Sequence, residues 1–251
     1  MGTDYRLVKK GMREPREGLI AQGHYSLALA IRHETELAQH GWFPTDTERL
    51  RTNLAFLESA VAKQADERGI AREKTREQEA AVDDAKVFIR RLRYALPKVL
   101  RNTSTPNVSH ESFATMGTLG RSPALIAAYL TRITPAVERL DAELAPFFGG
   151  ARPAEILADV RTRLVEANTE QELQLASLPA ETLRVYEAKG RLLEDIEDLN
   201  RAGRSAFDGN AEMAAPFNKD LILRERKKRR TKSEVVPIAK AGCETDKAEN
   251  S

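Results

Sequence analysis

Residues 50–96 decide the fold, and they read LRTNLAFLESAV from 50 to 61 and VDDAKVFIRRLRYAL from 82 to 96. The apolar positions of this stretch repeat at steps of four and three, with the second series resuming the register three heptads after the first: Leu50, Leu54, Leu57, Val61, then Val82, Ala85, Ile89, Leu92, Leu96. Such spacing places apolar side chains on one face of a helix. It predicts an all-α antiparallel helical bundle built around a long helix at residues 46–96.

The middle of this long helix is polar. Between Lys63 and Glu79 the register positions are polar or small: Gln64, Arg68, Ala71, Thr75 and Gln78. The helix either crosses a hydrated region that no partner covers, or breaks near Gly69 into a hairpin. A glycine inside a helix costs about 1 kcal/mol relative to alanine. Because no Pro, Asn or Ser cluster assists a break there, the sequence favours a continuous helix.

Composition supports a helical chain outside the membrane. Of 251 residues, 41% are hydrophobic, 31% charged and only 6% aromatic, and Ala, Leu, Glu, Arg and Lys dominate. The longest apolar run, Ala124–Leu130, is far shorter than the roughly 20 residues of a membrane span, so no transmembrane segment is predicted. The single Cys243 and a charged N-terminus without a signal-peptide stretch predict a reducing, cytoplasmic location.

A first helix is predicted from Pro15 to His40, because proline is tolerated in the first helical turn. Gly41 suits a left-handed C-terminal cap, and Thr45 with Glu48 matches the capping box that would begin the long helix. The connection between the two helices is very short. The sequence therefore predicts an antiparallel helix 1–helix 2 hairpin that extends from a bundle around the second half of the long helix.

Helix-ending signals divide the rest of the chain. Pro97 is expected to end the long helix, and residues 102–121 form a long polar loop that is either mobile or functional. A third helix is predicted from Ser122–Pro123 to Phe148, and Gly149–Gly150 end it. A fourth opens at Pro153 and is ended by Leu178–Pro179, and a fifth runs to Gly203.

These signals predict four regions along the chain. They are an N-terminal extension (1–14), a helical bundle (15–203), a short C-terminal helix with a basic run (204–232), and a disordered tail (233–251).

The basic character of the chain belongs to one segment. The net charge is +2, but Lys219–Lys232 contains eight basic and two acidic residues. The dense run inside it consists of Arg224, Arg226, Lys227, Lys228, Arg229 and Arg230. Such a run can bind nucleic-acid phosphates without sequence preference, although Phe217 is the only aromatic residue nearby for base stacking. The alternative is a solvated helix end whose cations complement the helix dipole.

Two further patterns are candidate ligand sites. Gly117–Ser122 contains Arg121 and precedes a helix start. Backbone N–H groups and the Arg121 guanidinium can therefore contact an anion there. The residue spacing of a phosphate-binding loop is missing, however. The alternative is a flexible connection. His33, Glu36 and His40 share one helical face, yet the Glu-x-x-His pairs of a di-metal bundle are absent, so we predict a polar face and no metal.

The carboxylate clusters give no indication of catalysis. They are Asp83–Asp84 and the group of Glu194, Asp195, Glu197 and Asp198. General acid–base chemistry needs carboxylates held in a pocket with separated pKa values, whereas clusters on amphipathic helices usually form solvated faces. Because no nucleophile or nucleotide motif accompanies them, we expect neither an enzyme nor a cofactor.

The sequence thus predicts a non-enzymatic helical-bundle interaction or structural protein. Its partner would be another protein or another copy of itself, and the candidate contact regions are the polar stretch of the long helix and the loop at 102–121. The alternative function is a nucleic-acid-associated protein that uses segment 224–230. A third, weaker alternative is an amphipathic helical protein that refolds onto membranes.

Overall fold

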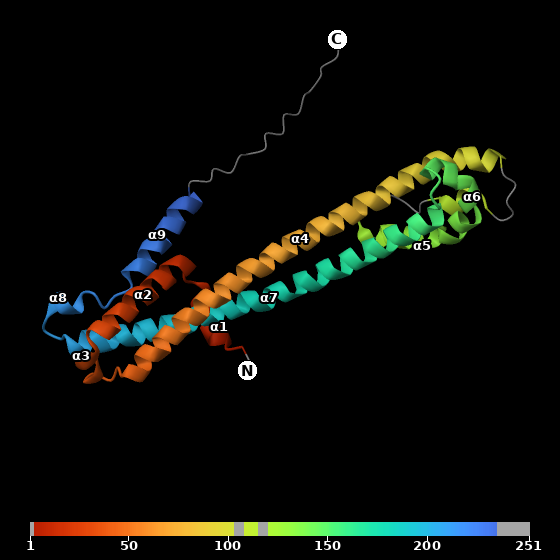
Figure 1. Cartoon of the computed structure of the whole chain (residues 1–251). Coiled ribbons are helices and arrows are strands. Elements are labelled where there is room, and N and C mark those ends of the chain that lie inside the picture. The colour runs from red at the N-terminus through yellow and green to blue at the C-terminus, as the bar shows by residue number, and fades with distance from the viewer. Residues whose placement is uncertain (1–2, 103–107, 115–119, 235–251) are drawn as a thin grey trace, which may run out of the picture. The chain divides into compact units, whose positions relative to one another are not determined.

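The computed structural model describes residues 3–102, 108–114 and 120–234. The chain is 86% helical, and the described residues contain no strand, so the predicted all-α class is confirmed. The elements in chain order are α1 (Tyr5–Met12), α2 (Arg16–Arg32), α3 (Glu34–Ala38), α4 (Pro44–Asn102), the 3₁₀ helix η1 (His110–Phe113), α5 (Pro123–Arg139), α6 (Asp141–Leu144), the 3₁₀ helix η2 (Ala145–Phe148), α7 (Pro153–Ala206), α8 (Ala211–Ala214) and α9 (Asp220–Glu234) (Figure 1).

The long helix α4 is continuous over 59 residues. It passes through Gly69, as predicted, but it also passes through Pro97, so the predicted end near Leu96 is wrong. A proline removes one backbone hydrogen bond and strains the preceding turn. Leu96 and Val99 are each only 4% exposed, and the packing of this turn in a hydrophobic core outweighs the cost of the proline.

Helix α7 is also longer than predicted. Its 54 residues include Pro179, so the predicted fourth and fifth helices are one helix that ends at Ala206. Leu164 before the proline and Val185 after it are both buried in hydrophobic cores. Packing on both sides therefore keeps the helix intact through the proline.

The N-terminal region differs from the prediction in two places. Residues 1–14, predicted as an extension, include α1, in which Asp4 Oδ1 accepts hydrogen bonds from the N–H of Arg6 (2.9 Å) and of Leu7 (3.3 Å). The predicted first helix breaks at His33, whose backbone (φ −117°, ψ 30°) leaves the helical region between α2 and α3. Gly41 has φ +82°, as its predicted capping role requires.

The predicted capping box of α4 is wrong by two residues. The helix begins at Pro44, and Asp46 Oδ2 accepts the backbone N–H of Phe43 at 2.8 Å. Glu48 accepts a hydrogen bond from Arg51 instead.

The region between α4 and α7 contains more short helices than predicted. The loop predicted at 102–121 includes η1, whose Phe113 is buried and whose carbonyl accepts a hydrogen bond from Tyr129 Oη at 3.0 Å. Its residues 103–107 and 115–119 lie outside the described residues. The predicted third helix begins at Pro123 but is interrupted at Leu140 (φ −107°, ψ 16°), so it forms α5, α6 and η2.

The chain divides into two compact units, whereas the sequence grouped residues 15–203 as one bundle. The first unit comprises residues 1–63 and 181–251, and the second comprises residues 64–180. In the first unit Leu50, Leu54 and Leu57 of α4 share a core with residues of α2, α7 and α9. In the second unit Ile89 and Leu92 pack with α5 and the first part of α7. Each half of the predicted seam is therefore buried in its own core.

Candidate functional site

The basic run lies on α9, which packs against α2 in the first unit (Figure 1). The two helices approach closely at Gly18, where a Cβ atom would lie 3.2 Å from the Cα atom of Ile222. The buried side chain of Gln22 accepts the backbone N–H of Leu221 at 3.2 Å, and Asn218 Oδ1 accepts that of Asp220 at 2.9 Å. The first turn of α9 is thus satisfied by side chains and fixed to α2.

Half of the predicted basic residues are paired within the chain. Arg226 binds the buried carboxylate of Glu14, with Nε 3.0 Å from Oε2, and Arg229 lies 2.8 Å from Glu17. Lys228 pairs with Glu225 at 3.2 Å on the same helix. The two pairs with Glu14 and Glu17 keep one face of α9 against the N-terminal region.

The remaining three predicted cations form an outward face. Arg224, Lys227 and Arg230 are exposed, and within the described part of the chain no carboxylate lies within ion-pair distance of them. Leu223 is 53% exposed beside them. We call Leu223, Arg224, Lys227 and Arg230 the α9 outer face.

Arg121 belongs to the second unit, so it is described apart from α9. It lines a hollow of about 300 Å³ together with Glu79, Asp83 and Lys86 of α4. Ser122 Oγ accepts the N–H of Leu125 at 3.4 Å and caps α5, as predicted. The glycine-rich residues 117–119 of the predicted anion site lie outside the described residues.

Helix α7 packs along the polar stretch of α4 at residues 63–79. The expectation that a continuous helix would be hydrated and uncovered there is therefore wrong. In the second unit Lys74 lies 2.7 Å from Glu170, Gln78 donates to Asn168 at 2.8 Å, and Gln174 donates to Glu67 at 2.6 Å. Polar side chains of this stretch, Gln78 among them, are therefore bonded to α7, whereas Arg68 is exposed and the Thr75 hydroxyl bonds within α4.

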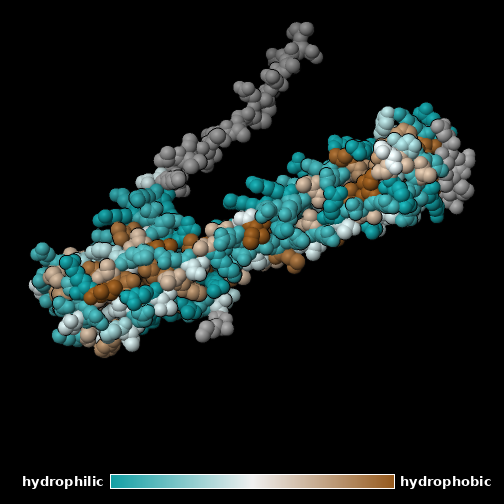
Figure 2. Space-filling view, in the orientation of Figure 1, coloured by the Kyte–Doolittle hydropathy of each residue, from teal (hydrophilic) through white to brown (hydrophobic). Residues whose placement is uncertain are grey.

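The solvent side of α7 carries a strip of uncharged residues. Its positions follow one another at steps of three and four, and all six are exposed: Thr162, Val165, Thr169, Leu173, Ala176 and Ala180. Leu173 is 68% exposed. Figure 2 shows that apolar patches interrupt the hydrophilic surface along the long helices. We call these six residues the α7 strip, a surface that the sequence reasoning missed although its spacing is readable in the sequence.

The acidic cluster at 194–198 is only partly solvated, which differs from the predicted solvated face, because one of its carboxylates is buried and others pair with neighbouring helices. Asp195 is 4% exposed and accepts hydrogen bonds from Arg49 Nε (2.8 Å) and Asn53 Nδ2 (2.6 Å) of α4. Glu194 pairs with Arg6 of α1 at 2.7 Å. Asp195 and Glu194 therefore bind helices together, which the sequence does not reveal because their partners are distant in the chain.

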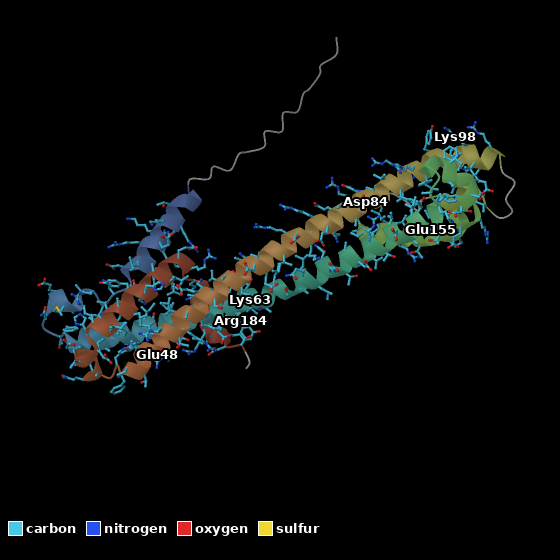
Figure 3. All side chains as sticks on the ribbon, viewed as in Figure 1. Glu48, Lys63, Asp84, Lys98, Glu155 and Arg184 are labelled. Carbon is cyan, nitrogen blue, oxygen red and sulfur yellow. The ribbon has the colours of Figure 1, made fainter. Side chains whose placement is uncertain are left out.

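The other acidic pair does face solvent. Asp84 of α4, labelled in Figure 3, lies 3.2 Å from Arg163 of α7, and both side chains are more than half exposed. Asp83 is also exposed. This cluster is solvated, as predicted.

The histidines of the predicted polar face have other contacts. The His33 ring lies against Phe207 and Phe217, with centroids 5.1 and 6.1 Å away, and His40 Nδ1 is 2.9 Å from Ser205 Oγ. A His–Ser hydrogen bond is one part of a nucleophile–base pair, but such a pair needs a third group that orients the base. In the ranges that the structure describes, no cluster of three or more His, Cys, Asp or Glu residues has the arrangement of a metal site.

Lys189 is a buried cation that the sequence analysis did not single out. It lies on α7 at 4% exposure, and its ammonium is 5.3 Å from the centroid of the Tyr186 ring. Burial, reinforced by the nearby charge of Arg229, lowers the pKa of Lys189 to about 8. No carboxylate among the described residues is within ion-pair distance of it.

The described helices include none that combines the length and the apolar character of a bilayer span. Comparison with models of known protein families, with curated proteins and with solved structures gives no match for this chain.

Proposed function

We propose that this chain is a non-enzymatic helical protein that associates with a second copy of itself. The observation that carries the proposal is the α7 strip. A solvent-facing helix surface normally carries charged or strongly polar side chains, whereas steps of three and four between uncharged residues are typical of a surface that packs against another helix. Leu173 provides a large exposed anchor, and Ala176 and Ala180 allow a close approach.

The charges beside the strip select a basic partner. Arg161 and Arg163 flank the first strip position, but from residue 165 to residue 181 α7 contains no Lys or Arg. Its charged residues there are Glu166, Glu170, Glu172 and Glu181. Glu170 is paired with Lys74, and Glu181 is paired with Lys63. Figure 3 labels Lys63 on α4. Glu166 and Glu172 remain exposed at the strip. Two strips packed on each other would bring like charges together, which is unfavourable, so a basic helix is the complementary partner.

The α9 outer face has the complementary character. It presents Arg224, Lys227 and Arg230 around the exposed Leu223. We therefore assign the α9 outer face of one copy to the α7 strip of another. The two leucines would be the buried anchors of the contact, and the charges would set its orientation and its association rate.

Sedimentation equilibrium of the full chain tests this assignment. We expect dimers or larger assemblies that dissociate as salt is raised, because exposed charges are screened. Leu173→Glu should give a monomer. Leu125→Glu is the matched control, because Leu125 is also exposed in the second unit but lies on α5. A wild-type chain that stays monomeric at every concentration, or equal dissociation by the control variant, would refute the proposal.

A charge exchange makes the test specific. Glu172→Lys should weaken association, and the added change Lys227→Glu should restore it, because the coupling between contacting residues appears only in the double variant. Two additive losses would show that α9 and the α7 strip do not meet.

Nucleic-acid association through the α9 outer face is the second candidate function. It is favoured by the three cations without an ion-pair partner among the described residues. Three phosphate contacts predict a slope of about −2.7 for log affinity against log salt concentration on duplex DNA. The triple change Arg224→Gln, Lys227→Gln, Arg230→Gln should remove this binding, and Leu173→Glu should leave it intact. A monomeric chain with this behaviour would favour the second function over the first.

A further inference from the structure

A basic pocket of about 400 Å³ lies in the first unit where the end of α7 meets the segment that leads into α9. Its lining consists of Glu197, Asn200, Arg201, Arg204 and Lys219. Small-molecule sites in proteins commonly have volumes of about 300–1,000 Å³. We call this cavity the Arg204 pocket.

Tight backbone packing holds one wall of the Arg204 pocket. Phe217 is buried against Gly203, where a Cβ atom would come within 2.1 Å of the phenyl ring. The carbonyl of Phe217 accepts a hydrogen bond from Arg204 Nε at 3.1 Å, and that of Asn218 accepts one from Asn200 Nδ2 at 2.9 Å. One hydrogen bond therefore anchors the exposed Arg204 side chain at the pocket before any ligand binds, which lowers the entropy cost of binding.

The carboxylate of the pocket is already neutralised. Glu197 accepts a hydrogen bond from Lys10 at 2.6 Å and from Lys219 at 2.8 Å. Burial by itself would raise the pKa of Glu197, but these two hydrogen bonds outweigh it and hold the pKa below its usual value. Glu197 thus stays ionised and serves to position the two ammonium groups.

The cations of the pocket are only partly paired. Arg201 pairs with Asp198, and its side chain is largely exposed. Arg204 has no carboxylate within ion-pair distance anywhere in residues 3–102, 108–114 and 120–234, and its terminal N–H groups are free of partners there. The amide oxygen of the buried Asn200 also accepts no hydrogen bond from the described residues. The pocket therefore offers hydrogen-bond donors and positive charge, together with one acceptor that solvent can reach.

We propose that the Arg204 pocket binds a small phosphate monoester. The planar guanidinium fork matches two phosphate oxygens, and charge-assisted hydrogen bonds of this kind are the strong ones. A dianion makes use of Arg204, Arg201 and Lys219 together, whereas a monocarboxylate cannot. A hydroxyl on the organic part of the ligand satisfies the amide oxygen of Asn200.

Calorimetric titration of the full chain with glycerol 3-phosphate, inorganic phosphate and acetate tests the site. We expect binding of both phosphates, tighter for glycerol 3-phosphate, and none of acetate. Arg204→Gln should weaken phosphate affinity at least about tenfold, as the loss of one charged hydrogen-bonded pair predicts. Arg139→Gln removes an exposed cation of the second unit, outside the pocket, and should leave the affinity unchanged.

A second variant covers the chance that Arg204→Gln loosens the turn at Phe217. Arg201→Gln removes a surface side chain bonded only to Asp198 among the described residues, so the far-ultraviolet circular dichroism should be unchanged while phosphate affinity falls several-fold. The proposal would be overturned by absence of phosphate binding to the wild-type chain, by equal loss in Arg139→Gln, or by no loss in Arg201→Gln. Binding of duplex DNA without binding of glycerol 3-phosphate would also overturn it.

Discussion

Replacement of Gly190 by alanine should destabilise the first unit because α1 crosses α7 at this glycine. A Cβ atom at Gly190 would lie 2.2 Å from the carbonyl oxygen of Leu7 and 2.7 Å from its carbonyl carbon, and real Cβ atoms essentially never come closer than 3.0 Å. The opposing Gly11 is equally crowded, with 2.0 Å to the carbonyl oxygen of Tyr186. Both obstacles are backbone atoms, so α1 has to move away from α7.

The size of the effect follows from two opposing terms. Overpacking of this kind lowers the free energy of unfolding by about 1–3 kcal/mol. Alanine raises it by about 0.5–1 kcal/mol, because glycine is unfavourable inside a helix. The loss cannot exceed the free energy with which α1 docks, because α1 can detach. We therefore expect a net loss of up to about 2.5 kcal/mol, with Leu7 and Val8 becoming exposed.

Gly69→Ala is the matched control because it has the opposite expected sign. Gly69 also lies inside a long helix, but no atom lies within 4 Å of its Cβ position. Alanine there should stabilise the chain by about 0.5–1 kcal/mol. Urea unfolding followed by circular dichroism measures both changes, and limited trypsin digestion at Lys9 and Lys10 reports whether α1 is released. Equal stabilisation by both substitutions, with α1 still protected, would refute the reasoning.

Two more predictions concern the core and the buried cation. Leu92→Ala should lower stability by about 2–5 kcal/mol because Leu92 is fully buried. Thr75→Ala should change stability little, because among the described residues the Thr75 hydroxyl bonds only to Ala71 O of its own helix. Equal melting temperatures of the two variants would contradict this prediction. Lys189→Met should stabilise the chain most below pH 8. The pKa of Lys189 is about 8 in the folded chain, whereas its ordinary value is 10.5. Between these two pH values the unfolded chain binds more protons than the folded chain, so the stability of the wild-type chain rises with pH. The advantage of the variant, measured from urea midpoints at pH 7 and pH 10, should therefore shrink at the higher pH, and a constant difference would count against it.

The sequence indicated local features well where local physics decides them. Gly41 and Gly149 end their helices with positive φ, Ser122 caps α5, and α4 continues through Gly69 because one glycine costs too little to break it. The helix ends predicted at Pro97 and Pro179 were wrong. A proline penalty is a local quantity, whereas the burial that outweighs it depends on residues far away in the chain.

The candidate surfaces show the same division. The basic composition of segment 224–230 was readable, but which of its cations are free was not, because Arg226 and Arg229 are paired with Glu14 and Glu17, more than 200 residues earlier. The Arg204 pocket was not predictable either, since its lining combines residues of α7 with Lys219, which lies outside that helix.

The sequence by itself determined the all-α class and the apolar seam of α4, because helix propensity and periodicity are properties of neighbouring residues. Only the tertiary structure decided that each half of the seam has its own core, that Asp195 is buried in an ion-pair network, and that the α7 strip faces solvent. These outcomes depend on which helices meet. Packing energy between distant segments decides that, and no local pattern encodes it.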